Sequence, residues 1–149
     1  MKIEKMVHTS LLVRDMDKAI KFFSEVLDLE FPEPWETPEL DIRETTDAVG
    51  LINLVTPLSP TGVTGRELAR RGERAVCICY KVPSVDEATA EMQAHGIRVI
   101  AKSVWGEMPW VAFDPRDTFG VMIEFVEYRA KNEYLFQMFP SLPKLLPKK

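Results

Sequence analysis

The chain has 149 residues, about the length of one domain, and its 46% hydrophobic and 28% charged content is ordinary for a globular protein. A net charge of −4 argues against nucleic acid as a partner. No run of 18 apolar residues is present, so no membrane span is expected, and residues 1–6 lack the apolar core of a signal peptide. We expect Cys77 and Cys79 to be free thiols, which favours a cytoplasmic location.

The first part of the chain predicts a strand, a helix and further strands. Residues 6–13 alternate as a strand does. Apolar residues then recur at helical spacing over 16–27, and Asp15 is placed to cap the helix. Several prolines interrupt the pattern before two further predicted strands, at 41–46 and 49–55.

The second part repeats this plan after a turn-rich linker and a short helix at 66–71. Ser84 and Glu87 form a capping box for a helix, and Gly96 suits the left-handed residue that ends it. The predicted strands are 75–82, 97–102, 110–113 and 121–126. A group of arginines in the linker predicts either a solvated helix face or a site for a phosphate or carboxylate: Arg66, Arg70, Arg71 and Arg74.

The two parts are echoes of one another, and the match between their first strand and helix is displaced by 69 residues. Segment 8–19 matches 77–88, and Leu51–Val55 matches Met122–Val126. This alignment sets His8 against Cys77 and Asn53 against Glu124. All four are residue types that can donate electrons to a metal.

A duplicated βαβββ module with these segments resembles the vicinal oxygen chelate superfamily. The resemblance runs over about residues 6–127 and is strongest at 8–23 and in Asp114–Glu124. Within that group the order of segments is most similar to methylmalonyl-CoA epimerase. The resemblance implies an α+β fold in which two tandem βαβββ modules form a curved, incomplete mixed β-barrel around a cavity.

The resemblance implies domain limits as well. A domain over residues 1–127 would contain modules at about 1–57 and 75–127, joined by a linker at 58–74. Residues 128–149 would form a C-terminal extension that docks on the core or on a second subunit, or is disordered. A homodimer is expected from the resemblance alone.

The resemblance places one divalent metal (Zn, Fe, Co, Ni or Mn) on the concave face. The ligand positions carried over are His8, Asn53, Cys77 and Glu124. Asn and Cys stand where the epimerase-like proteins generally have Gln or Glu and His. A Cys thiolate would favour a softer ion such as Zn or Fe.

The function implied is that of an epimerase, isomerase or lyase. Such an enzyme acts on a small carbonyl or thioester compound through a metal-stabilised enolate. The resemblance places Glu44 as the general base, with Glu107 as a weaker alternative. Trp105 and Trp110 would contact a flat or apolar ligand. The alternative function is metal-free binding or sequestration of a small molecule, as in bleomycin-resistance proteins.

Overall fold

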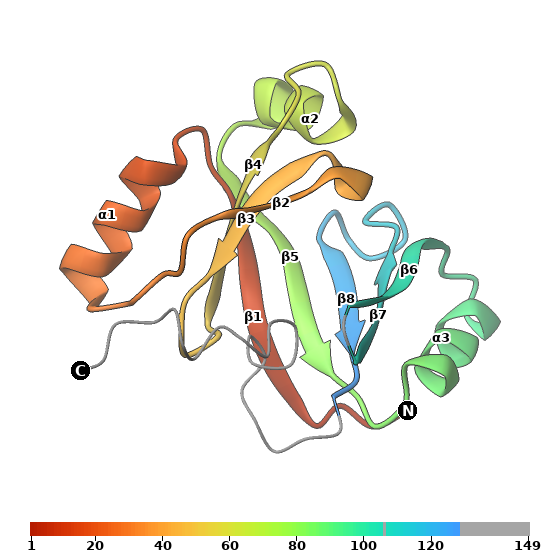
Figure 1. Ribbon diagram of the computed structural model, residues 1–149. Helices are drawn as coiled ribbons and strands as arrows, with labels where there is room; N and C mark the ends of the chain where they lie inside the picture. The colour runs from red at the N-terminus through yellow and green to blue at the C-terminus, as the bar shows by residue number, and fades with distance from the viewer. Residues whose placement is uncertain (106, 129–149) are drawn as a thin grey trace.

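A computed structural model of the chain describes residues 1–105 and 107–128. Its sheet has eight strands in the order β2-β3-β4-β1-β5-β8-β7-β6, with parallel and antiparallel neighbours (Figure 1). The elements in chain order are β1 Lys5–Leu12, α1 Met16–Leu27, β2 Trp35–Thr37, the single 3-10 turn η1 Pro38–Leu40, β3 Ile42–Thr46, β4 Ile52–Pro57, α2 Val63–Arg71, β5 Arg74–Lys81, α3 Val85–Ala94, β6 Val99–Trp105, β7 Met108–Phe113 and β8 Met122–Val126.

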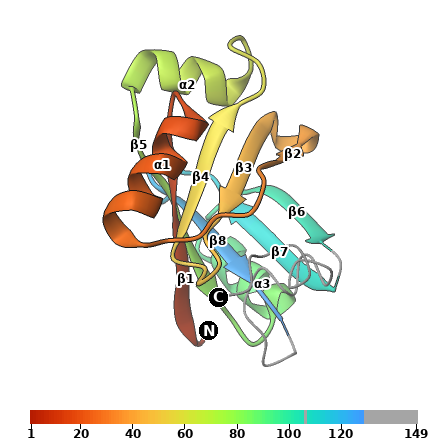
Figure 2. The same cartoon turned by 60° about the vertical axis from the view of Figure 1, so that its left-hand side comes forward.

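The order of these elements is βαβββ twice, so the predicted fold class is confirmed. β1 and β5, the first strands of the two repeats, pair antiparallel at the centre of the sheet. Each also pairs in parallel with the last strand of its own repeat, β1 with β4 and β5 with β8. The sheet curls, with β3 and β4 on one limb and β6 and β7 on the other (Figure 2). The last strand of each repeat is thereby brought next to the centre.

The predicted helix ends form as expected. The Asp15 carboxylate accepts a hydrogen bond of 2.9 Å from the Lys18 amide, and the Ser84 hydroxyl accepts one of 3.2 Å from the Glu87 amide. Gly96 has a φ of 80°, the left-handed conformation expected for it after α3. Local side-chain chemistry therefore determines where these helices begin and end.

The second repeat packs its helix more completely than the first. Phe113 and Phe125 meet edge to face at 5.2 Å, in a core cluster that also contains Val85 and Ala88 of α3. The apolar stripe of α1 is present, but Leu27 at its end is 53% exposed. An apolar helix face thus remains in contact with solvent beside the first repeat.

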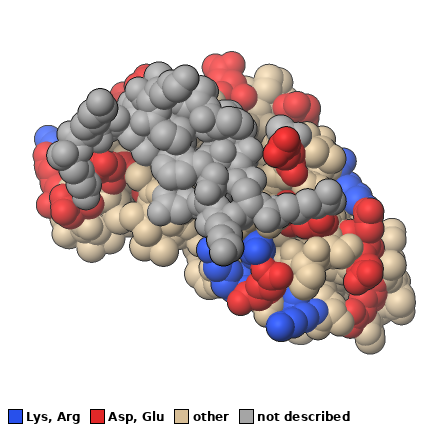
Figure 3. Space-filling view, turned by 60° about the horizontal axis from the view of Figure 1, so that its bottom comes forward, with Lys and Arg blue, Asp and Glu red and all other residues tan. Residues whose placement is uncertain are grey.

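Charged side chains lie mainly at the surface and are partly paired. On the face seen in Figure 3, the visible Lys and Arg side chains lie next to Asp and Glu side chains. Arg98 binds Asp117 through two hydrogen bonds of 2.8 Å. None of the helices in the described ranges is long and apolar enough to cross a membrane.

Candidate functional site

The centre of the concave face is built by β1, β5 and β8. Register places His8 opposite Cys79 and Ser10 opposite Cys77 across the β1–β5 pair. In the β5–β8 pair, Cys79 lies opposite Glu124. Because side chains of a strand alternate between faces, Cys77 and Cys79 project to the same side.

Three donor groups meet at this point. One ligand atom each from His8, Cys79 and Glu124 lie within 4.8 Å of one another, and all three side chains are buried. The predicted ligand Cys77 adjoins this group, with its Sγ 3.7 Å from Oε2 of Glu124. The Sγ of Cys79 lies 3.8 Å from Oε1 of the same carboxyl group. Neither cysteine is in a disulfide.

Burial shifts the protonation of every member of this group. The pKa of Glu124 is raised to about 8, first by burial and then by the nearby Glu44 charge, against the lowering effect of the thiol hydrogen bonds. Burial lowers the pKa of His8 to about 4, so its imidazole is neutral at pH 7. The pKa values of Cys77 and Cys79 are raised, first by burial and then by the Glu124 charge.

The predicted base, Glu44, lies on β3 of the first repeat and is 4% exposed. Its Oε1 accepts a 2.6 Å hydrogen bond from the Thr37 hydroxyl, and its Oε2 accepts a 2.9 Å bond from the Asn53 amide. Burial raises the pKa of Glu44, while hydrogen bonds from Asn53, Thr37 and Trp35 lower it. The carboxyl group is thus held in one orientation by its neighbours.

Asn53, a predicted metal ligand, therefore contacts Glu44 through its amide nitrogen. Its Oδ1 is buried and has no hydrogen-bond partner among the described residues. A buried carbonyl oxygen without a donor is costly, so this atom is suited to a cation or to a ligand that donates a hydrogen bond. The structure thus brings Asn53 and Glu44 together on β4 and β3. β4 is next to β1, the strand that carries His8 and separates β4 from the thiol-bearing β5.

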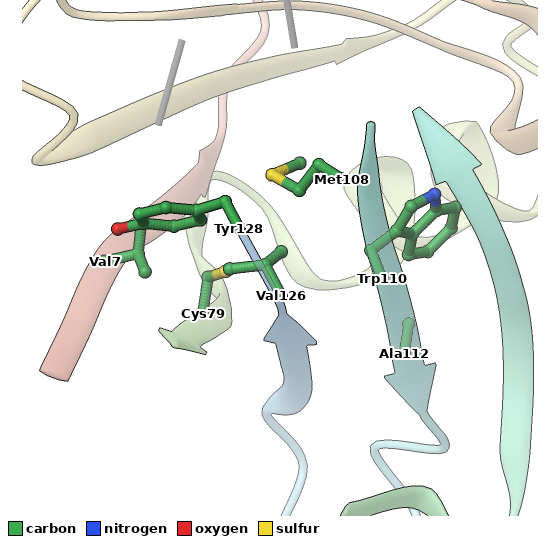
Figure 4. Packing of buried hydrophobic residues seen from close by; sticks show 7 residues of the cluster. All are labelled: Val7, Cys79, Met108, Trp110, Ala112, Val126 and Tyr128. Atoms are coloured by element: carbon green, nitrogen blue, oxygen red, sulfur yellow. The ribbon is translucent and has the colours of Figure 1, made fainter. Parts of the chain in front are cut away.

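The second repeat supplies an apolar, aromatic wall. Trp105 and Trp110 stack with ring centroids 4.3 Å apart and planes inclined by 31°. Trp110 belongs to a buried cluster with Cys79, Val126 and Tyr128 (Figure 4). Trp110 Nε1 and the Tyr128 hydroxyl are buried without hydrogen-bond partners in the described part of the chain. Within this apolar surface, the indole N–H and the hydroxyl are two groups that could hydrogen-bond to a bound molecule.

The remaining predicted residues lie elsewhere. Glu107 is exposed in the turn between β6 and β7. Arg71 on α2 forms an ion pair with Glu67 at 3.6 Å, as a solvated helix face would, whereas Arg74 begins β5 and pairs with the same Glu67 at 2.9 Å. A surface cavity of about 560 Å³ is lined by the start of α1 and by Arg43, and contains none of the predicted ligands.

Sequence reasoning had not assigned roles to Cys79 or Thr37. Because residues two apart on a strand point to the same face, the sequence already indicated that Cys79 lies beside Cys77 and is a candidate ligand. Thr37 approaches Glu44 only because Pro38–Leu40 forms a tight 3-10 turn between β2 and β3. No sequence pattern would have revealed this contact.

The donor set fits a divalent metal. His8 offers a neutral imidazole, the two cysteines offer sulfur, and Glu124 offers a carboxylate, all of which are ordinary ligands of transition metals. Lys81 is on the same strand and face as the cysteines, but its ammonium pairs with Glu4 at 2.6 Å. Within residues 1–105 and 107–128, no Lys or Arg ion pair is made by Glu124 or Glu44.

Residues 5–125 match the family model of the Glyoxalase/Bleomycin resistance protein/Dioxygenase superfamily. The match covers most of the chain, and the chain belongs to this superfamily.

Solved structures of two epimerases share the fold. Methylmalonyl-CoA epimerase from Mycobacterium tuberculosis is 24% identical, with a TM-score of 0.76, over 87% of this chain and 91% of that one. Streptomyces coelicolor methylmalonyl-CoA epimerase in complex with 2-nitronate-propionyl-CoA is 21% identical, with a TM-score of 0.76, over 87% of this chain and 100% of that one. At these identities the likeness establishes the fold.

A curated relative is the lactoylglutathione lyase of Schizosaccharomyces pombe. It is 24% identical over 76% of this chain and 44% of its own length. The chain thus spans less than half of that relative.

Proposed function

We propose that the protein is an isomerase or lyase that removes a proton next to the carbonyl group of a small carbonyl or thioester compound. The observation that carries the proposal is the pair of buried carboxyl groups on one concave face, Glu44 and Glu124, without a basic ion-pair partner in the described residues. One is oriented by hydrogen bonds and the other lies among metal-ligand atoms. Two carboxyl groups in different environments suit two different roles.

Glu124 and His8 are the proposed centre of a metal site, with Cys77 and Asn53 as the further ligands carried over from the sequence. A divalent ion there would supply Lewis-acid stabilisation for the negative charge that develops on the substrate oxygen. The Asn53 Oδ1 is left available because the amide nitrogen is engaged by Glu44. Among Zn, Fe, Co, Ni and Mn, the sulfur ligand favours Zn or Fe.

Glu44 is the proposed general base. Its carboxylate would take the proton from the carbon next to the carbonyl and, in an epimerase, allow return of a proton on the other face. The hydrogen bonds from Thr37 and Asn53 stabilise the ionised form and aim it. Trp110 and its apolar neighbours would exclude water from the reacting carbon.

Exchange of the substrate proton with solvent tests this function directly. Protein loaded with zinc or cobalt would be incubated in deuterium oxide with a panel of acyl-CoA thioesters and hemithioacetals, and followed by proton NMR. We expect loss of the signal next to the carbonyl in at least one compound, and chelator should abolish the loss. Absence of exchange in every compound, from protein with one bound metal per chain, would reject the proposal.

A second candidate function is metal-free binding of a small apolar molecule. It is favoured by the stacked Trp105 and Trp110 and by the buried, unpartnered polar groups of Trp110 and Tyr128. Thermal-shift measurements separate it from the enzyme. A ligand that raises the melting temperature equally with and without chelator, and is recovered unchanged, would favour this alternative.

A homodimer in the cytoplasm is the proposed state of the protein. The exposed apolar residues of α1, Phe22, Val26 and Leu27, support an interface between two copies, and the free thiols support a reducing compartment. Sedimentation equilibrium of the wild type and of Val26→Ser tests the dimer. A dimer that Val26→Ser weakens is the expected result, and a wild-type monomer would contradict it.

A further inference from the structure

Cys79 occupies a position that the predicted ligand set does not include. It lies directly opposite His8 on β1 and directly opposite Glu124 on β8. Its Sγ is among the three donor atoms that lie within 4.8 Å of one another, whereas Cys77 adjoins the group from the side of Ser10. Judged by geometry, Cys79 is at least as well placed as Cys77 to share a metal with His8.

The two thiols share one carboxyl group. Cys77 approaches Oε2 of Glu124 at 3.7 Å, and Cys79 approaches Oε1 at 3.8 Å. The arrangement follows from the strand pairing, because residues two apart on β5 point to the same side and Glu124 is in register with the second of them. Both sulfur atoms therefore border the same carboxylate from neighbouring positions.

A packing role alone does not account for this arrangement. Cys79 does pack with Val7, Val126 and Tyr128, as a small apolar side chain would (Figure 4). Its sulfur nevertheless faces a buried carboxyl group, and thiols are weak hydrogen-bond donors that compensate such a group poorly. A cation bound jointly by the sulfurs and the carboxylate would remove this deficit.

We propose that Cys77 and Cys79 both ligate the metal, in a site with two sulfurs, the His8 imidazole and the Glu124 carboxylate, where Cys79 takes the place of Asn53. Each thiol would release its proton to solvent as its metal–sulfur bond forms. Two thiolates with one nitrogen and one oxygen select a thiophilic ion such as zinc, and disfavour manganese and magnesium. The inference rests on the proposed function only in requiring a metal at Glu124.

Cobalt(II) binding tests the inference without an activity measurement. Metal-free, full-length protein would receive one equivalent of cobalt(II), with bound metal measured by equilibrium dialysis and cobalt–thiolate bonds by their near-ultraviolet charge-transfer absorption. We expect a strong band in the wild type, about half of it per bound cobalt in Cys77→Ser and in Cys79→Ser, and none in the double variant. Thr46→Val, which changes a buried hydroxyl opposite Asn53 and removes no sulfur, is the matched control and should keep the full band.

The outcomes separate the inference from the proposed function. A full band in Cys79→Ser, together with loss of the band in Cys77→Ser, would overturn the claim that Cys79 ligates the metal. The proposed metal enzyme would remain. Binding of one cobalt per chain without any charge-transfer band would overturn ligation by either thiolate and would still leave a metal enzyme. No cobalt binding at all would remove the metal from the proposed function as well.

Cadmium-113 NMR of the wild type supplies a test that needs no variant to fold. The resonance moves downfield with each sulfur ligand, so a position typical of two sulfurs supports the inference. A position typical of oxygen and nitrogen ligands alone would overturn it.

Discussion

The two repeats carry one buried carboxyl group each, in unlike surroundings. In the first repeat, both oxygens of Glu44 accept short hydrogen bonds, from Thr37 and Asn53. In the second repeat, the two oxygens of Glu124 instead face the weakly donating thiols of Cys77 and Cys79. This contrast supports the proposed roles, with Glu44 as the group that exchanges a proton and Glu124 as a ligand of the cation.

In the proposed function, the two repeats divide one chemical task between them. The repeats share strand order, helix caps and curvature, so each presents polar groups to the same concave face. Substitution at a few positions then gives Glu44 of the first repeat hydrogen-bond donors, and gives Glu124 of the second repeat the sulfur atoms of β5 as neighbours. Four experiments sharpen or break this contrast.

The largest effect is expected for Glu44→Gln. Glutamine keeps the size of the side chain but cannot take a proton, so solvent exchange of the substrate proton should fall by about 10²- to 10⁴-fold. Proton NMR in deuterium oxide measures the rate. A rate within threefold of the wild type would exclude Glu44 as the base.

Phe113→Ala tests the denser packing of the second repeat. Phe113 is fully buried against Phe125, so its truncation should lower the free energy of unfolding by about 3–5 kcal/mol. Phe23→Ala on the half-buried face of α1 is the control, with an expected cost of about 1 kcal/mol. Urea titrations compare the two. Equal losses would show that the repeats are packed alike.

The pH dependence of stability tests the environment of Glu124. The folded pKa of about 8 lies above the ordinary value of 4.5, so the folded, metal-free protein holds a proton that the unfolded chain releases. Its stability should therefore fall as pH rises from about 4.5 to about 8, by at most about 5 kcal/mol. Glu124→Gln should flatten this fall in urea titrations done with chelator. An unchanged slope in that variant would assign the proton to another group.

The smallest effect is expected for Thr37→Val, which removes one hydrogen bond to Glu44. This hydrogen bond contributes about 1 kcal/mol to holding the Glu44 carboxylate in its reactive orientation, so its loss should slow proton exchange about fivefold. The bond lowers the pKa of Glu44, so its removal should also move the acidic limb of the pH–rate profile to higher pH. Thr37→Ser, which keeps the hydroxyl, should restore both. A slower rate with no movement of that limb would indicate a packing role instead.

Much of the fold could be predicted because its signals are local. Apolar periodicity, the Asp15 and Ser84 caps and Gly96 all report on a few neighbouring residues. The repeat itself then indicated two modules. The extent of burial on α1 could not be predicted in the same way, because it depends on what the rest of the chain places against that helix.

The site was less accessible to sequence reasoning, because it depends on register between strands. His8 faces Cys79 rather than Cys77 through the particular pairing of β1 and β5, which includes shifts next to His8. A shift of this kind moves every cross-strand neighbour and leaves no trace in residue order. The strands that meet were predictable, but the atoms that meet across them were not. The C-terminal extension predicted from residue 128 onward lies almost wholly outside the described residues.

The most direct test of the contrast is the metal content of Glu44→Gln and Glu124→Gln, compared by equilibrium dialysis against zinc at equal protein concentration. The account predicts one zinc per chain in Glu44→Gln, as in the wild type, and at least a 100-fold loss of zinc affinity in Glu124→Gln. Retention of zinc by both variants, or its loss from both, would contradict the division of roles between the two carboxyl groups.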